Sequence, residues 1–353
     1  MYSLNPCLLI YPKLIDNKRH FIAEIDSSVA PLIIDSPLVV LSLNKLPQKF
    51  SKKQALKIFF ESGIEFDLGK EILLFLCSNQ IILNDSTLNK SYPAKQAWYK
   101  YGWAEAFKYH FATKNYPFLK MGEKDAFQKD TERMVRFKKS SPVPDIYQSF
   151  SSIRRVYLEK IEKDSNVNVL ISDINKKEKR GIRALSLFFN LCFGERSKQE
   201  FGVQGNFLRK AIPSGGSRHP SEVFFFAFKN SPLQPGLYHY NVKKHSLDCL
   251  KEGNFYLECK KSTFDLFDKF PKKPLGLLVF TSLYERAMWR YRDSRSWRAP
   301  LIDVGHALML YRELALALEF KTYTYQKFND KELTDIIGID PIKQTPLYIG
   351  TLI

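Results

Sequence analysis

The sequence has no long hydrophobic run. Its most apolar early stretch, residues 29–43, is interrupted by prolines and polar residues. It therefore falls short of the about eighteen consecutive apolar residues that a membrane-spanning helix needs. The first residues also lack the basic region, apolar run and small-residue cleavage site of a signal peptide. We expect a soluble, cytoplasmic protein with no membrane contact.

Paired cysteines and clustered histidines are missing as well. The five cysteines are odd in number and scattered, and the six histidines lack metal-ligand spacing. These patterns predict neither a disulfide framework nor a zinc site. The Gly-x-Gly-x-x-Gly motif of a nicotinamide nucleotide site is absent too.

The chain has abundant apolar residues and an excess of positive charge. Of its 353 residues, 44% are hydrophobic and 14% aromatic, which is enough for a sizeable core. The formal net charge is +17, with lysines spread along the chain in pairs such as Lys52 and Lys53. This dispersion favours solvated faces over a nucleic-acid stripe, and it leaves attraction to an acidic peptide open.

Residues 1–90 are predicted to form a small winged-helix-like module. The expected elements are strands at 8–11 and 21–25, helices at 51–62 and 71–78, and a strand at 80–83. A strand edge beside a helix can clamp an extended peptide. A dimerisation or packing appendage is the alternative.

Residues 91–145 are predicted to form a helical linker region. It contains an aromatic amphipathic helix at 94–112 and a charged stretch at 121–139, and the breaker at 140–144 marks the main domain boundary. The third region, 146–353, alternates strands and helices, which favours an α+β fold. Its expected elements are a loop and short helix at 148–156, a helix at 182–194, a polar loop at 195–206, strands at 222–228, 236–241, 245–250 and 275–281, a helix at 301–320 and a terminal strand at 346–353.

A glycine-containing loop precedes the apolar strand at 222–228. It reads Pro-Ser-Gly-Gly-Ser-Arg-His-Pro over residues 213–220, which excludes an ordinary helix. Adjacent glycines allow backbone N–H groups to approach a flat or anionic ligand, and Arg218 can add hydrogen bonds. Taken alone, the segment is more typical of a surface turn than of a ligand-binding loop.

A second unusual segment, residues 284–306, combines arginines with tryptophans and tyrosines. A core would not accept so many guanidinium groups without anionic partners. The segment is therefore either an ion-pair network with Glu285, Asp293 and Asp303 or an anion site. The start of the helix after it would suit an anion or a ring edge.

Four motifs in this order resemble the FMN-dependent SagB/McbC-type peptide dehydrogenases of the nitroreductase fold. They are Pro-Ser-Gly-Gly-Ser-Arg-His-Pro, Gly-Leu-Tyr-His-Tyr-Asn, Glu-Arg-Ala-Met-Trp-Arg-Tyr-Arg and Asp-Val-Gly-His. The resemblance covers residues 146–353. It implies an α+β fold with a mixed sheet flanked by helices, an FMN cofactor and an obligate homodimer, with the terminal strand packing on the partner.

The resemblance also assigns site residues. It places the glycine loop against FMN, an arginine pair at the FMN phosphate, and a Gly-His pair at the start of the long helix. The resulting cofactor-binding residues are Pro213, Ser214, Gly215, Gly216, Arg218, Arg154, Arg155, Gly305 and His306.

The implied catalytic pair is Arg290 and Tyr291, where azoline-oxidising relatives carry lysine and tyrosine. Arginine stays protonated, so Tyr291 is assigned the proton transfer and Arg290 can hold an anion. Azoline oxidation also removes a hydride, which no side chain can accept, and this requirement favours a flavin.

The leading hypothesis is an FMN-dependent dehydrogenase that oxidises a ribosomally made precursor peptide alongside a cyclodehydratase. Two alternatives stay open from the sequence. One is an NAD(P)H-dependent reductase of nitro compounds or quinones on the same fold. The other is a non-catalytic scaffold that binds peptide or nucleic acid.

Overall fold

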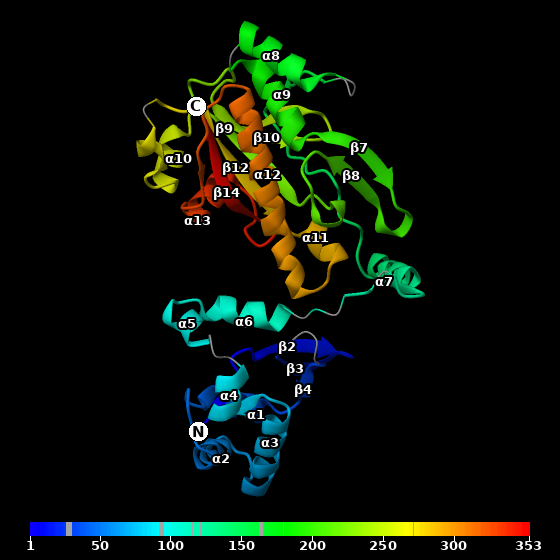
Figure 1. Ribbon diagram of the computed structural model, residues 1–353, viewed down its shortest axis with the longest axis vertical. Coiled ribbons are helices and arrows are strands. Elements are labelled where there is room, and N and C mark those ends of the chain that lie inside the picture. Colours follow the sequence, from blue (N-terminus) through cyan, green and yellow to red (C-terminus); the bar gives the residue numbers. More distant parts are fainter. Residues whose placement is uncertain are drawn as a thin grey trace. The chain divides into compact units, whose positions relative to one another are not determined.

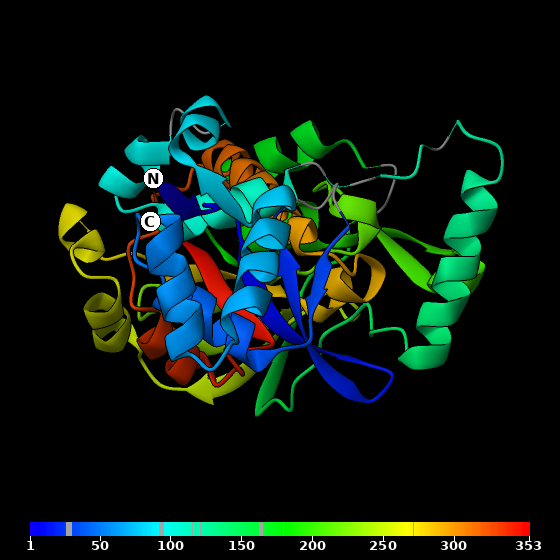
Figure 2. The ribbon, with the colours of Figure 1, turned by 90° about the horizontal axis from the view of Figure 1, so that it is seen from below.

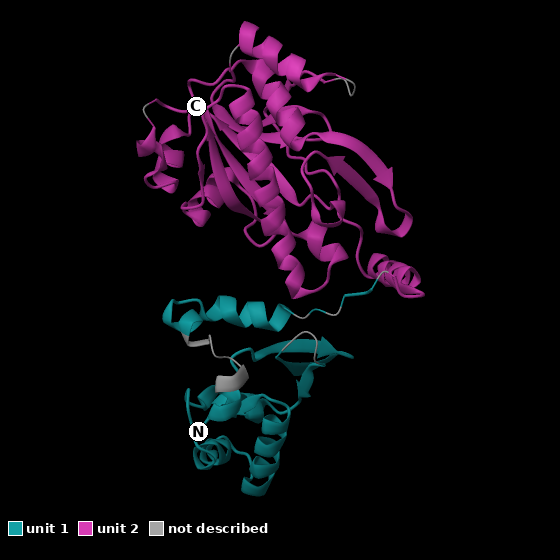
Figure 3. Cartoon of the chain, viewed as in Figure 1, with its two compact units in different colours: residues 1–121 teal, residues 122–353 magenta. Residues whose placement is uncertain are grey.

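A computed structural model describes residues 1–25, 30–91, 95–114, 116, 118–120, 122–161, 165–178, 180–270 and 272–353. The chain divides into unit 1, residues 1–121, and unit 2, residues 122–353 (Figure 3). No helix within the described ranges is long and apolar enough to cross a membrane. Within the same ranges, no group of three or more His, Cys, Asp or Glu side chains could hold a metal ion.

Unit 1 combines short strands with helices. Its elements are β1 (Tyr2–Leu4), β2 (Leu9–Ile15), β3 (Lys18–Glu24), β4 (Leu32–Ile34), α1 (Pro37–Lys45), α2 (Lys52–Glu61), α3 (Phe66–Ser78), β5 (Ile82–Asn84), α4 (Asp85–Ser91), α5 (Lys95–Lys100) and α6 (Ala104–Thr113). Strands β2, β3 and β4 form one antiparallel sheet, and β1 pairs with β5.

Helices α2 and α3 pack on each other, as Figures 1 and 2 show. Ser51 begins α2 through a reciprocal capping box with Gln54. Phe50, Phe59 and Leu73 are buried in the core of the unit. The order helix, helix, strand matches the sequence pattern, and the winged-helix interpretation stays a prediction.

The aromatic segment is two helices rather than one. Gly102 adopts φ +75° between α5 and α6, a left-handed conformation that interrupts a helix. Ala94, where the single helix was expected to begin, lies outside the described residues.

Unit 2 contains the remaining elements. They are α7 (Ala126–Ser140), β6 (Arg154–Tyr157), α8 (Val167–Lys177), α9 (Ile182–Phe193), β7 (Glu195–Glu200), η1 (Gly202–Gln204), β8 (Asn206–Lys210), η2 (Gly215–Ser217), β9 (Ser221–Ala227), β10 (Gly236–Asn241), β11 (Ser246–Glu252), α10 (Tyr256–Ser262), η3 (Leu266–Lys269), β12 (Gly276–Leu283), α11 (Glu285–Arg290), η4 (Ser294–Trp297), α12 (Arg298–Ala317), β13 (Thr324–Tyr325), α13 (Asp330–Ile337) and β14 (Gln344–Leu352).

The division between the units falls before the expected breaker. Helix α7 belongs to unit 2, because its Asp130 forms an ion pair with Arg290 of α11 at 2.8 Å. The breaker at 140–144 ends this helix, as the sequence indicated, and does not separate the two units.

A seven-stranded sheet forms the centre of unit 2. Its order is β13-β14-β12-β9-β10-β11-β6, and each neighbouring pair is antiparallel. Figure 1 labels its strands β14, β12, β9 and β10. The apolar run of β9 is buried on both faces. Phe225 packs in a core with α9 and α12, whereas Phe224 and Phe226 pack in a second core with α10 and α13. The predicted α+β class is therefore confirmed.

Three segments differ from the expectation. Residues 195–206 contain strand β7, which pairs with β8 in a hairpin, and residues 154–157 form the edge strand β6. Both are rich in exposed or half-exposed charged residues, so their sequences lack the apolar alternation of a strand. The terminal strand β14 lies between β12 and β13, and β13 pairs with Ile349 and Gly350 on its outer edge.

A substitution at the centre of the sheet tests this packing. A Cβ at Gly276 would overlap the Phe225 ring and the backbone oxygen of Phe226. We expect Gly276→Ala to lower the free energy of unfolding of the full chain by about 1–3 kcal/mol, because the strand backbone must shift. Gly122→Ala, at a position with open space, is the matched control and should change it by less than about 0.5 kcal/mol in urea unfolding. Equal effects would contradict the register of β9 and β12.

Candidate functional site

The glycine loop is fixed to helix α12 by Asp303. Ser214 Oγ donates to Asp303 Oδ2 at 2.6 Å, and the Gly215 N–H donates to Oδ1 at 3.2 Å. The backbone N–H of His219 donates to Ser214 Oγ at 2.9 Å. Burial raises the pKa of Asp303 above its ordinary value, although both hydrogen bonds act in the opposite direction. The loop is thus tied to the second turn of α12.

Gly216 allows the loop to approach the predicted catalytic tyrosine. Its φ is +58°, and a Cβ there would overlap the hydroxyl oxygen of Tyr291. A Cβ at Gly215 would lie 3.3 Å from that of Ala299. Only glycine fits at position 216 without strain, so Gly216 allows the loop backbone to lie close to Tyr291.

Helix α7 holds Arg290 beside Tyr291. Arg290 forms an ion pair with Asp130 at 2.8 Å, and only 13% and 12% of the two side chains are exposed. Arg133 contacts the same carboxylate at 2.5 Å. The Arg290 guanidinium lies 5.1 Å from the ring centre of Tyr291. The structure therefore brings both predicted catalytic residues to the glycine loop.

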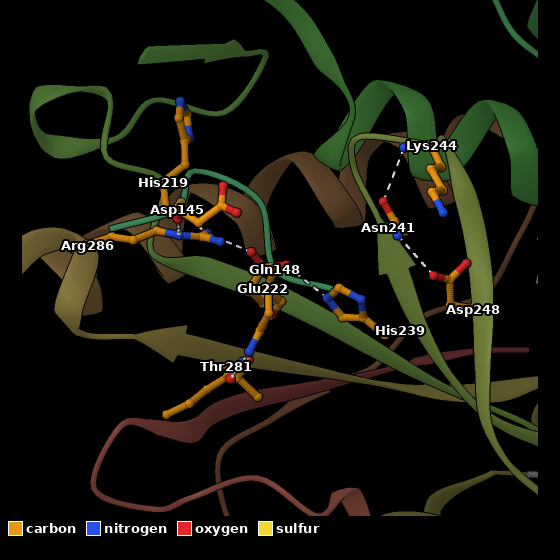
Figure 4. Close-up of polar contacts among 11 residues, drawn as sticks. Asp145, Gln148, His219, Glu222, His239, Asn241, Lys244, Asp248, Thr281 and Arg286 are labelled. Atoms are coloured by element: carbon orange, nitrogen blue, oxygen red, sulfur yellow. Dashed lines mark hydrogen bonds and ion pairs between the residues drawn. The ribbon is translucent and has the colours of Figure 1, made fainter. Parts of the chain in front are cut away.

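A buried network lies beneath the loop (Figure 4). Arg286 pairs with Glu222 at 2.6 Å, and Glu222 contacts His239 at 3.1 Å. Arg286 also donates to the backbone oxygens of Asp145 and His219, each at 2.9 Å. Burial alone would raise the pKa of Glu222, but the charge of Arg286 and the hydrogen bond from His239 lower it to about 2. The carboxylate is consequently ionised.

Further positive groups surround this network. Arg218 is 9% exposed and lies over the Phe207 ring at 4.3 Å, and it donates to the Gln204 carbonyl at 3.1 Å. Burial lowers the pKa of Arg218 to about 10 and that of Lys210 to about 8. Burial also lowers the pKa of His219 to about 3, with Lys210 adding to the effect. His219 is therefore neutral, and the additional cations beside the network are Arg218 and Lys210.

Arg154 and Arg155 have partners elsewhere. They lie on β6, at the edge of the sheet and separated from β9 by two strands. Arg155 binds Asp248 through two nitrogens at 2.6 and 3.0 Å, and Arg154 contacts Glu252 at 3.0 Å. The structure does not bring this pair to the glycine loop.

Gly305 and His306 do not lie at the start of the helix. Helix α12 begins at Arg298, so both residues are within it and exposed. The residue of this motif that reaches the loop is Asp303. In this motif the buried Asp303 carboxylate, rather than the Gly-His pair, contacts the loop.

The sequence did not predict which carboxylates pair with Arg286 and Arg290. Among the described contacts, Asp293 caps η4 by accepting from Ser296, and Asp303 holds the loop, so neither carboxylate is the partner of Arg286 or Arg290. Asp130 and Glu222 pair with the arginines instead. One feature of the sequence indicated such a partner: Glu222 is a lone carboxylate within an otherwise apolar strand.

Unit 2 is built on an antiparallel sheet between helical layers, and the glycine loop leads into its central strand β9. A solved structure of a protein classed with the nitroreductases from Anabaena variabilis has a TM-score of 0.50 and 20% identity over 64% of this chain and 45% of its own. Unit 2 therefore has the predicted nitroreductase fold. No family model matches the chain.

The chain is similar in sequence to the trifolitoxin-processing protein TfxB of Rhizobium leguminosarum bv. trifolii. The two are 26% identical over 214 residues, which span 57% of each chain. It is also 26% identical over 149 residues to a protein of Methanocaldococcus jannaschii classed with the nitroreductases, covering 42% of this chain and 72% of that one. The chain is thus similar in sequence both to a trifolitoxin-processing protein and to a protein classed with the nitroreductases.

Two serines of the loop provide a matched test. We expect Ser214→Ala to destabilise the full chain by about 1–3 kcal/mol, because the Asp303 oxygen and the buried His219 N–H both lose their partner. Ser217→Ala removes only an exposed contact with Arg209 and should cost less than about 0.5 kcal/mol. Chemical unfolding of both variants measures the difference, and equal stabilities would show that Asp303 does not hold the loop.

Proposed function

We propose that this chain is an FMN-dependent oxidoreductase that acts on a ribosomally synthesised precursor peptide, with azoline-to-azole oxidation as its reaction. The observation that carries the proposal is the convergence of the Pro213–Gly216 loop, Tyr291 and Asp303. The fold of unit 2 and the sequence similarity to a trifolitoxin-processing protein support it.

The residues present fit a flavin mononucleotide. Such a ligand is flat and anionic, and the site offers a backbone loop beside buried guanidinium groups. Arg218, Arg286 and Arg290 each have a buried nitrogen without a hydrogen-bond partner. These donors would hold anionic oxygens, and residues 213–216 would lie against the ring. When bound, the flavin supplies the hydride acceptor that the side chains lack.

The proton that leaves the substrate carbon is assigned to a side chain of the site. Tyr291 lies with its phenol oxygen at the glycine loop and, as the phenolate, would accept the proton removed from a substrate carbon and become the neutral phenol. Arg290 keeps its positive charge over the Tyr291 ring and would stabilise that phenolate. Asp130 orients the guanidinium and does not reach the reacting atoms.

The spectrum of the purified protein gives the first test. We expect flavin absorption bands, release of FMN on denaturation, and loss of two hydrogens from a synthetic peptide that contains one thiazoline ring. Colourless protein that takes up no FMN would contradict the proposal. Bleaching of the flavin by NADPH without any peptide would instead favour reduction of nitro compounds or quinones, the reaction class suggested by the archaeal relative.

The proton-transfer role is tested separately. Tyr291→Phe should retain FMN and lose about 100-fold to 10,000-fold in turnover of the thiazoline peptide, because the proton acceptor is removed. Tyr157→Phe, on the edge strand with 69% of the residue exposed, is the control and should keep full activity. Unchanged turnover in the Tyr291 variant would assign the proton to another group.

Helix α12 supports the proposed homodimer. Ile302, Met309 and Leu316 are 56%, 59% and 71% exposed and recur at helical spacing, and Gly305 between them has open space above it. A small residue within an apolar stripe allows close approach of another chain. Sedimentation should show that Ile302→Glu with Met309→Glu gives monomers, whereas Leu257→Glu on α10 leaves the dimer intact. A monomeric wild type would exclude the dimer.

Unit 1 is proposed to engage the precursor peptide. Its three-stranded sheet has β2 and β4 as edge strands, and an extended peptide can add to such an edge. A cyclodehydratase is the proposed partner, because azole formation requires a ring to be closed before it is oxidised.

A further inference from the structure

A hollow beside the glycine loop is lined by two of the arginines whose donors were assigned above to anionic oxygens, Arg218 and Arg286. Two of its residues, Arg218 and Arg286, are charged and more than nine-tenths buried, being 9% and 3% exposed. The complete lining is Val143, Pro144, Ile146, Asn206, Ser217, Arg218 and Arg286. The hollow therefore presents two guanidinium groups against an otherwise apolar and neutral wall.

Arg218 has no counter-ion within the described part of the chain. Its hydrogen bonds go to the carbonyl and side-chain oxygens of Gln204, which are neutral, and its other neighbours are the rings of Phe207 and Trp289. None of the ion pairs among the described residues includes it. A buried charge without a partner is costly, and Arg290 nearby adds repulsion.

Both arginines also have unused donors. Arg218 Nε and Arg286 Nη2 are buried and have no hydrogen-bond partner. Three contacts fix Arg286 in place through its other nitrogens: the carboxylate of Glu222 and the backbone oxygens of Asp145 and His219. A water molecule could satisfy these N–H groups, but it could not neutralise Arg218. An anion does both.

We propose that this hollow binds an oxyanion, a phosphate ester or a carboxylate of a ligand, between Arg218 and Arg286. Arg218 supplies the uncompensated charge, and Arg286 supplies a rigidly held donor. Ser217 and Asn206 line the same hollow and add neutral hydrogen-bonding groups. Both arginines therefore bind the ligand, whereas Glu222 positions Arg286.

The oxyanion has two chemical sources under the proposed function, on which this part of the inference rests. One is the phosphate of the flavin, because Arg154 and Arg155 are already paired with Asp248 and Glu252. The other is a carboxylate of the peptide substrate. Both sources present oxygens of the same kind to the guanidinium groups.

The first experiment uses inorganic phosphate with the full chain free of flavin. At constant ionic strength, replacing chloride by phosphate should raise the melting temperature of the wild type. In Arg218→Met the apparent affinity for phosphate should fall by at least about tenfold. Arg218→Lys, which keeps the charge, should retain part of the response. An equal response in wild type and Arg218→Met would overturn the proposal.

The control is Arg209→Met. Arg209 is exposed, lies near Arg218 in the chain and contacts Gln199 and Ser217. Arg209→Met should leave the stabilisation by phosphate unchanged, because this variant removes one positive charge outside the hollow. If Arg209→Met and Arg218→Met reduce the response equally, general screening explains it and the hollow is not a site.

The second experiment separates the two sources. If the flavin phosphate occupies the hollow, Arg218→Met weakens FMN at least about tenfold, leaves riboflavin unchanged, and phosphate no longer stabilises the FMN-loaded protein. If the hollow serves a substrate carboxylate, phosphate still stabilises the loaded protein and acetate competes with it. Protein that binds phosphate but no flavin would refute the proposed function and leave the oxyanion site standing.

Discussion

The ion pair between Arg286 and Glu222 joins segments that are far apart in the sequence. Arg286 stands on α11, Glu222 on β9, and the Asp145 and His219 carbonyls belong to two loops. Removing one member of such a pair leaves an isolated buried charge, which costs about 3–5 kcal/mol. The glycine loop, the start of α11 and the segment after α7 therefore keep their positions through one guanidinium group.

The sequence predicted best those segments whose residue pattern directly sets the backbone conformation or the burial of a strand. The apolar run at residues 223–228 predicted a buried strand, and β9 is buried on both faces. The glycines at 215 and 216 predicted a backbone that approaches a ligand closely; the structure shows Gly216 close to the Tyr291 hydroxyl, and the approach to a ligand stays a prediction. Strands β10 and β11 pair as a hairpin, and two runs of strand-forming residues around a short polar turn are typical of one.

Long-range pairing was beyond sequence reasoning. Arg154 and Arg155 have the composition of an anion site, and only the register of β6 against β11 places Asp248 opposite Arg155. Likewise, nothing local indicated that Asp130 of α7 would meet Arg290, which lies far along the chain. Such ion pairs depend on tertiary contacts, and charge spacing does not encode them.

Strand β9 also constrains how the chain acquires its structure. It pairs with β10, which follows directly in the sequence, and with β12, which arrives only after the intervening helix α10. Until β12 is available, the Phe224–Phe226 segment has an open edge and apolar side chains on both faces, the features of an aggregation-prone strand. Folding of unit 2 thus depends on late, non-local contacts, and this places a slow step between synthesis and a stable sheet.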